Sequence, residues 1–352
     1  MFKIKLYLMF LLSSLTLQSA EIVDQNPVGV IQGIDSLIRH PEGIAFSPSG
    51  DLVAIANSEG GNILFFLSSD CCISSSQVSP IYVIDGLNSP LGYPHDLSFS
   101  PDGEHLAVAC RGNNRIMIYK RNIGNDFYEQ EPFVVIEGNQ LQLPGINAVK
   151  YSPTGNCLGV CDVAGHQIAF FLYNNDTYES LPYQVIQAPE DILYQPDGLA
   201  FSSDGRLLAV TSHGTHSLLI FEKTSSSEGK YSASPVEILK GEETNFCFTH
   251  SVCFHPLDDT LAVSSAGGRK TLSLFKKVSD TVPRYSIVPS QTFEIYNPET
   301  IHLQQYNKEE GGVKGVAFSP DGKILGLCAQ DMGDPLKSIL FYTIGTRESS
   351  GG

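Results

Sequence analysis

Six polar or charged residues recur at one position of a repeated sequence pattern, four residues before an aromatic residue. The aromatic anchors are Phe46, Phe99, Tyr151, Phe201, Phe254 and Phe318, and the residues before them are Glu42, His95, Asn147, Asp197, His250 and Lys314. Carboxylates, imidazoles and an amide at one equivalent position can bind a small polar ligand or a cation. Histidines among them can also carry protons near neutral pH.

More histidines fall in the segments that join the third and fourth strands of the repeats. We expect these loops to open on the same face as the ring, which adds His166, His213 and His216 beside Arg111. The sequence therefore predicts a ligand-binding site here, with His95 and His250 as the candidate catalytic residues if the protein is an enzyme. A second interpretation is that ring neighbours only neutralise each other, Lys314 with Glu42 and Asp197 with His250, in a water-filled channel.

The elements that must position these residues are short strands. Successive anchors are 53, 52, 50, 53 and 64 residues apart. In the second repeat the runs 81–84, 96–100, 106–110 and 116–119 are separated by turns rich in Gly, Pro and Asn, without helical periodicity. Six such copies predict an all-β fold, a six-bladed β-propeller of four-stranded blades.

The ends of the chain predict how the ring closes. Residues 28–31 match the first strand of the later repeats, whereas the last repeat ends with only its inner three strands. We therefore expect the N-terminal strand to complete the last blade beside residues 339–342, which covers an unpaired edge. This gives one propeller domain over residues 26–345, followed by a flexible tail at 346–352. The segment 291–312 is predicted to be a long surface loop.

Residues 1–20 have the pattern of an export signal. Lys3 and Lys5 precede an apolar run, and Ser19 and Ala20 end the segment with small side chains. The run is too short to span a bilayer, which needs about 20 residues. We expect cleavage after Ala20 and an exported protein, either periplasmic or secreted.

The net charge of the chain limits the kinds of partner that it can bind. The chain has 22 Lys and Arg against 38 Asp and Glu, a formal net charge of −16, which argues against nucleic acid and anionic membranes as partners. We expect a monomer without a membrane span.

Five of the eight cysteines fall in repeat strands and are predicted to be small core residues: Cys110, Cys157, Cys161, Cys253 and Cys328.

The repeat signature Pro-x-Gly-Ile/Leu-Ala-Phe-Ser-Pro-x-Gly, followed by Leu-Ala-Val and by Asn-x-Ile-x-Ile-Tyr, resembles bacterial YVTN-type and lactonase-like β-propellers, which are related to NHL and WD repeats. Six-bladed propellers similar to gluconolactonase and diisopropylfluorophosphatase bind calcium at the channel centre through Glu, Asn and Asp. The resemblance thus implies Glu42, Asn147 and Asp197 as metal ligands. Asp197 stands where that pattern has Asn and His250 where it has Asp, and Lys314 adds a positive charge at the rim. Two carboxylates with two histidines suit zinc better than calcium, which prefers six to eight oxygens.

Two functions follow from this pattern. The first is an exported binding module, without a cofactor, that recognises a protein, peptide or small ligand on the polar face at the channel mouth. The second is a metal-dependent hydrolase of the lactonase or phosphotriesterase type, in which a calcium or zinc ion is held by the ring and His95 or His250 is the general base. The chain has no nucleophile elbow and no His-Glu-x-x-His motif, which favours the first function.

Overall fold

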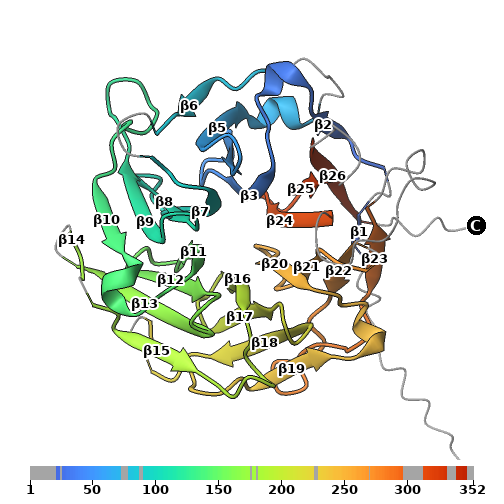
Figure 1. Ribbon diagram of the computed structural model, residues 1–352. Coiled ribbons are helices and arrows are strands. Elements are labelled where there is room, and N and C mark those ends of the chain that lie inside the picture. The colour runs from blue at the N-terminus through green and yellow to red at the C-terminus, as the bar shows by residue number, and fades with distance from the viewer. Residues whose placement is uncertain are drawn as a thin grey trace, which may run out of the picture.

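Six antiparallel sheets stand around a central axis as the blades of a propeller (Figure 1). They are seen in a computed structural model that describes residues 21–23, 26–72, 78–86, 90–174, 177–179, 181–225, 229–268, 270–295, 312–330 and 338–346. The only helices in these ranges are four short 3-10 turns: Ile34–Ser36, Ser68–Cys72, Gly138–Leu141 and Glu242–Thr244. The predicted all-β, six-bladed fold is confirmed.

The first three blades run outward from the axis in chain order. Blade one consists of β3 (Pro41–Phe46), β4 (Leu52–Asn57), β5 (Asn62–Leu67) and β6 (Tyr82–Ile84). Blade two consists of β7 (Pro94–Phe99), β8 (His105–Cys110), β9 (Arg115–Lys120) and β10 (Val134–Glu137). Blade three consists of β11 (Ile146–Tyr151), β12 (Cys157–Asp162), β13 (Gln167–Asn174) and β15 (Gln184–Gln187), with β14 (Thr177–Tyr178) paired to the end of β13.

The next two blades repeat this order. Blade four consists of β16 (Pro196–Phe201), β17 (Leu207–Ser212), β18 (Ser217–Glu222) and β19 (Glu237–Lys240). Blade five consists of β20 (Thr249–Phe254), β21 (Leu261–Ser265), β22 (Thr271–Phe275) and β23 (Gln291–Glu294). The outermost strand of each blade is thus the first strand of the following sequence repeat, as β6 shows by pairing with β5.

Blade six joins the two ends of the chain. Its inner strands are β24 (Gly312–Phe318), β25 (Ile324–Gln330) and β26 (Ser338–Thr346), and β2 (Gly29–Ile31) pairs with β26. The predicted closure by the N-terminal strand is therefore confirmed. A further strand, β1 (Glu21–Val23), pairs with the end of β26 and lies before the predicted start of the domain at residue 26. Thr346, assigned to the flexible tail from the sequence, pairs with Glu21, and residues 347–352 lie outside the described ranges.

The prediction of a surface loop over 291–312 is wrong for its first four residues. Gln291–Glu294 is the outermost strand of blade five, because Phe293 turns inward and is 7% exposed while its neighbours point outward. A strand needs only this alternation on a half-buried surface. Residues 296–311 lie outside the described ranges.

The hydrophobic core is divided into six slabs, each lying between two adjacent blades. In the first slab Phe65 of blade one packs with Leu97 and Tyr119 of blade two. Because each sheet buries apolar side chains on both faces, a single blade is not stable alone and the ring must close.

Two smaller expectations concern cysteines and membranes. The strand cysteines Cys110, Cys157, Cys161 and Cys328 are fully buried, as predicted for core residues, and Cys253 is half-buried. Within the described ranges no helix has the length and apolar character needed to cross a membrane.

Candidate functional site

A β-bulge places each of the six ring residues. In every blade the pairing between the innermost strand and its neighbour slips at the ring position, for example between Pro41 and Gly43 around Glu42. The same slip surrounds the ring residue in the other five blades. A bulge leaves one residue out of the ladder and re-aims its side chain. The sixfold bulge therefore directs the ring side chains together at one mouth of the channel.

Glycines after three ring residues draw the inner strands close together. A Cβ atom on Gly43 would lie 2.9 Å from the carbonyl oxygen of His95, and one on Gly198 would lie 2.6 Å from that of His250. A Cβ on Gly315 would lie 2.5 Å from the carbonyl oxygen of Glu42. Contacts this short exclude any side chain, so the glycines permit a narrow channel in which ring residues of different blades touch.

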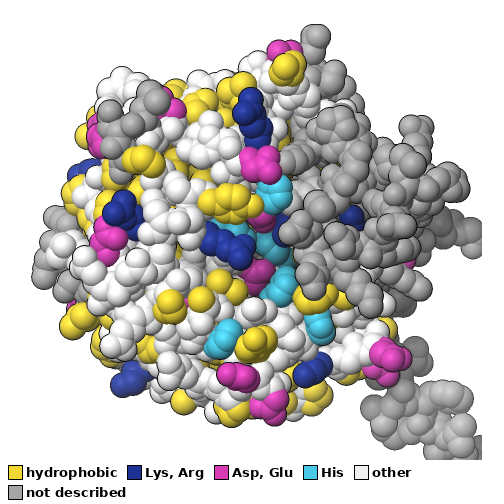
Figure 2. Space-filling model, in the orientation of Figure 1, with side chains coloured by type: hydrophobic (Ala, Val, Ile, Leu, Met, Phe, Trp, Pro, Cys, Tyr) yellow, Lys and Arg dark blue, Asp and Glu magenta, His cyan; other side chains and the backbone are white. Residues whose placement is uncertain are grey.

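Five of the six ring residues form the floor of a cavity that we call the channel-mouth cavity, whereas His95 does not line it. Its volume is about 450 Å³, and its lining is polar apart from Val163 and the Tyr93 ring: His40, Glu42, Tyr93, Arg111, Asn147, Val163, Gln195, Asp197, His213, His250, Lys314 and Gln330. Figure 2 shows histidine side chains along the centre of this face, with acidic and basic side chains among them.

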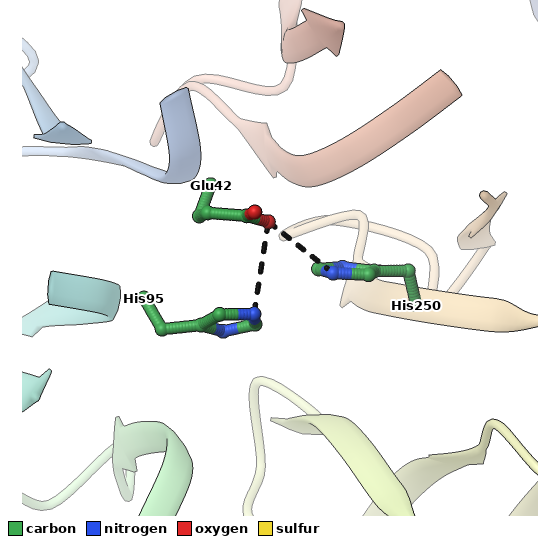
Figure 3. Close-up of side chains that lie close together, drawn as sticks. All are labelled: Glu42, His95 and His250. Atoms are coloured by element: carbon green, nitrogen blue, oxygen red, sulfur yellow. Dashed lines mark ion pairs between the residues drawn. The ribbon is translucent and has the colours of Figure 1, made fainter. Parts of the chain in front are cut away.

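The carboxylate of Glu42 lies between two histidines of the ring (Figure 3). Its Oε2 is 3.4 Å from Nε2 of His250 and 3.6 Å from Nε2 of His95, and it makes no hydrogen bond. Glu42, His95 and His250 are 3%, 3% and 5% exposed. The imidazole rings of the two histidines stack with centroids 5.2 Å apart.

Two further nitrogen-bearing side chains flank Glu42. The Nζ of Lys314 is 3.8 Å from Oε2, and Nδ1 of His40 is 3.1 Å from Oε1. The predicted pairing of Lys314 with Glu42 is thus present. So is the pairing of Asp197 with His250, whose Oδ2 and Nε2 are 3.6 Å apart.

Asp197 is the centre of a second cluster. The side-chain amide of Asn147 donates a hydrogen bond to Oδ1 of Asp197, and Nδ1 of His213 is 3.4 Å from Oδ2. Three nitrogen-bearing groups from three blades, counting His250, therefore hold this carboxylate. His213 lines the cavity, as the sequence predicted.

The surroundings of these groups set their pKa values. Burial lowers the pKa of His95 to about 4, although Glu42 and Asp197 oppose the change. Burial would raise the pKa of Glu42, but Lys314 and His95 together hold it well below its usual range. In the same way His250 and His213 outweigh burial and lower the pKa of Asp197. At neutral pH the ring thus carries two carboxylates and an uncharged His95.

No family model and no curated protein matches this sequence. What the site can do must therefore be argued from its own geometry.

The calcium set implied by the resemblance does not fit this geometry. Calcium is held by six to eight oxygens. The ring groups nearest to Oε2 of Glu42 are nitrogens of His95, His250 and Lys314. The amide nitrogen of Asn147 donates to Asp197, whose carboxylate is also close to nitrogens of His213 and His250, so Asp197 is surrounded by nitrogens and not by a cation with other oxygens.

Two of the predicted binding histidines serve the backbone. Nδ1 of His166 accepts a hydrogen bond from the backbone N–H of Gln195, and Nδ1 of His216 accepts one from that of Phe248. Each thereby ties its blade to the next. Both residues have positive φ, 52° and 53°, at the turn before the third strand of the blade, and neither lines the cavity. These contacts are structural, since they fix the loop that enters the following inner strand.

A second tier of residues also lines the cavity. His40, Tyr93 and Gln195 stand two positions before ring residues, and all three line the cavity. The sequence placed His40 on this face with the other histidines, but it gave no role to Tyr93 or Gln195. Gln330 joins them by donating to the backbone carbonyl of Pro41 at 2.7 Å. The signal for this tier was present in the sequence, because the position two before the ring residue is polar or aromatic in four repeats and glycine in two.

Proposed function

We propose that this propeller is an exported binding module that takes a small, polar, acid-bearing ligand in the channel-mouth cavity. Ligand pockets typically have volumes of about 300–1,000 Å³ and are mostly apolar. The channel-mouth cavity has the volume of a small-molecule site, about 450 Å³, but a polar lining. A ligand rich in hydrogen-bonding groups suits such a lining, because an apolar ligand would leave these groups unpaired.

The observation that carries the proposal is that Arg111 lies at the cavity without a carboxylate partner in the described part of the chain. Its guanidinium lines the cavity, and no carboxylate among the described residues pairs with it. Arg115, the first residue of β9, is by contrast paired with Glu137 at 3.0 Å. The two carboxylates on the cavity floor already have partners, so Arg111 is the group left to bind an acid, and its planar fork suits a carboxylate or phosphate.

Calorimetric titration with a panel of uronic acids, hydroxy acids, sugar phosphates and neutral sugars tests this proposal. We expect acidic members to bind and Arg111→Ala to weaken that binding by about tenfold to a hundredfold, the value of a charge-assisted hydrogen bond. Arg115→Ala is the matched control and should bind like the parent. Neutral sugars that bind as tightly as acids, or an unchanged affinity in R111A, would contradict the proposal.

The alternative function, a metal-dependent hydrolase of lactonase type, is favoured by the convergence of Glu42, His95 and His250 at the cavity floor. His213, held 3.4 Å from Asp197 at the cavity wall, would then be the general base in place of the two predicted histidines. Lactone hydrolysis that is abolished by a chelator and by His213→Gln would establish this function over simple binding.

We also propose that the chain is related to the YVTN-type and lactonase-like propellers and that residues 1–20 direct its export. The repeat signature and the six-bladed fold support the first statement. The second is supported by the sequence pattern of residues 1–20, and cleavage after Ala20 would remove none of the strands in the described part of the chain. N-terminal sequencing of the protein from an extracytoplasmic fraction should begin at Glu21.

A further inference from the structure

We propose that Glu42, His95 and His250 form a binding site for a zinc-class transition-metal ion at the floor of the channel-mouth cavity. The ligand atoms would be Oε2 of Glu42 and Nε2 of both histidines. One oxygen and two imidazoles differ from the all-oxygen set that calcium requires, and they match the ligands that zinc and its first-row neighbours prefer. The inference stands whatever the cavity binds.

The spacing of the three atoms supports an ion between them. Ligand atoms at about 2.0–2.2 Å from a tetrahedral zinc ion lie about 3.3–3.6 Å from one another. Here Oε2 of Glu42 is 3.4 Å from Nε2 of His250 and 3.6 Å from Nε2 of His95. These separations are too long for good hydrogen bonds, and Oε2 makes none.

The hydrogen bonding of His95 gives an independent argument. Its Nδ1 lies 3.1 Å from the backbone carbonyl oxygen of Asn147, which can only accept a hydrogen bond. Nδ1 of His95 therefore carries a proton, and Nε2 is the ring atom that faces Oε2 of Glu42. A metal ion bound between these two atoms would take Nε2 and Oε2 as ligands while Nδ1 keeps its hydrogen bond to the carbonyl oxygen. Histidines that bind a metal through one ring nitrogen regularly donate the N–H of the other to a backbone carbonyl oxygen or a carboxylate.

The cluster also has room for one ion. A small void of about 10 Å³ is lined by Glu42, His95, Asp197 and His250 together with backbone of the inner strands. This is about the space that a single water-sized particle occupies. Three protein ligands leave one position of a tetrahedral ion open, as in catalytic rather than structural zinc sites, and Glu42 and His250 both face the channel-mouth cavity.

Lys314 is the competitor of such an ion. Its ammonium lies 3.8 Å from Oε2, and Glu42 is its ion-pair partner among the described residues. A metal ion at the site would displace the ammonium toward the cavity, where the side chain is already 13% exposed. Removing the charge of Lys314 should therefore strengthen metal binding, whereas a surface histidine site would not respond.

The test is titration of chelator-stripped protein with Zn²⁺ alone, followed by calorimetry, and with Co²⁺, followed by the visible spectrum of a four-coordinate ion. We expect one Zn²⁺ per chain, an affinity at least about tenfold lower in both His95→Gln and His250→Gln, and a higher affinity in Lys314→Met. His166→Gln is the matched control, because that histidine lies outside the cluster, and it should bind like the parent. Thermal unfolding without metal checks that each variant is folded.

Three results would overturn the inference. They are binding of less than one Zn²⁺ per chain, equal affinity in the parent and in the His95→Gln/His250→Gln double variant, and preference for Ca²⁺ over Zn²⁺. None of them bears on whether acids bind at Arg111, so this inference and the proposed function can fail separately.

Discussion

At the scale of single residues, His255 replaces a serine that the other five blades share. In those blades a serine follows the anchor aromatic and bonds within the turn between the first two strands, at Ser47, Ser100, Ser152, Ser202 and Ser319. The buried imidazole of His255 instead reaches the carbonyl oxygen of Gly322 in blade six at 3.1 Å. Its other nitrogen lies 3.0 Å from Oδ1 of Asp258, so this turn links two blades through a charged group.

Asp258→Asn should therefore make the free energy of unfolding less dependent on pH in the acid range. Burial raises the pKa of Asp258, but the hydrogen bonds from His255 and Thr260 outweigh it and lower the pKa to about 2. Because this carboxyl has a lower pKa in the folded chain than its ordinary value of 3.8, its ionised form stabilises the folded state at pH values above 3.8. This contribution is lost as the pH falls toward 2. Allowing for the half-exposed position, we expect the variant to lose about 1 kcal/mol at pH 6 and nothing near pH 2.

Denaturant unfolding at several pH values between 6 and 2 measures this difference. Asp126→Asn is the control, because Asp126 is 84% exposed and its ion pair with Arg121 is a surface one. A difference between parent and D258N that stays constant with pH would show that the loss is one of packing and not of charge.

At the scale of elements, a buried tyrosine locks the loop after the third strand of four blades: Tyr128, Tyr178, Tyr231 and Tyr285. In blades two and four its hydroxyl donates to a glycine carbonyl in the turn between the first two strands, at Gly103 and Gly205, each at 2.7 Å. In blade five it donates to Asp259 at 2.9 Å. The tyrosine thus fastens the outer part of a blade to the face opposite the channel-mouth cavity.

Tyr231→Phe should destabilise the protein by about 1–2 kcal/mol, because the buried carbonyl of Gly205 loses its partner while the ring keeps its packing. Tyr183→Phe is the control, since Tyr183 lies in the same region but is 42% exposed. The free energy of unfolding in urea distinguishes the two. Equal losses in both variants would mean that the hydroxyl of Tyr231 contributes nothing specific.

The sequence predicted the elements better than the contacts between them. Anchor spacing and strand alternation are local, so they located the blades, and counting back four residues from each anchor located the ring. The contact of Glu42 with His95 and His250 depends on the channel width, which Gly43 and Gly198 set through backbone approach between blades. His166 and His216 were assigned to the site because their loops face the mouth, but the backbone N–H groups that occupy them belong to the next blade, 29 and 32 residues further along.

At the scale of the whole molecule, stability depends on the ring being closed. Each hydrophobic slab lies between two blades, and the slab between blades six and one contains Ile31 of the closing strand. Ile31 is fully buried and pairs with Ile339 of β26, so β2 joins the two ends of the domain within this slab, and β1 pairs with β26 beyond it. Without β2 the middle of β26 would be an open edge, which pairs readily with other chains.

Ile31→Ala should accordingly cost about 2–5 kcal/mol, the range for removing a large side chain from a packed core. Ile34→Ala makes the same chemical change three residues later, where the side chain is 90% exposed, and should cost less than about 0.5 kcal/mol. Deleting residues 21–31 should have a larger effect, since it removes both β1 and β2 and exposes β26 from Ile339 to Thr346, and the truncated protein should self-associate. Denaturant unfolding with light scattering measures both quantities. If the truncated chain is monomeric and as stable as the parent, the other strands suffice to close the ring and the N-terminal strands are dispensable.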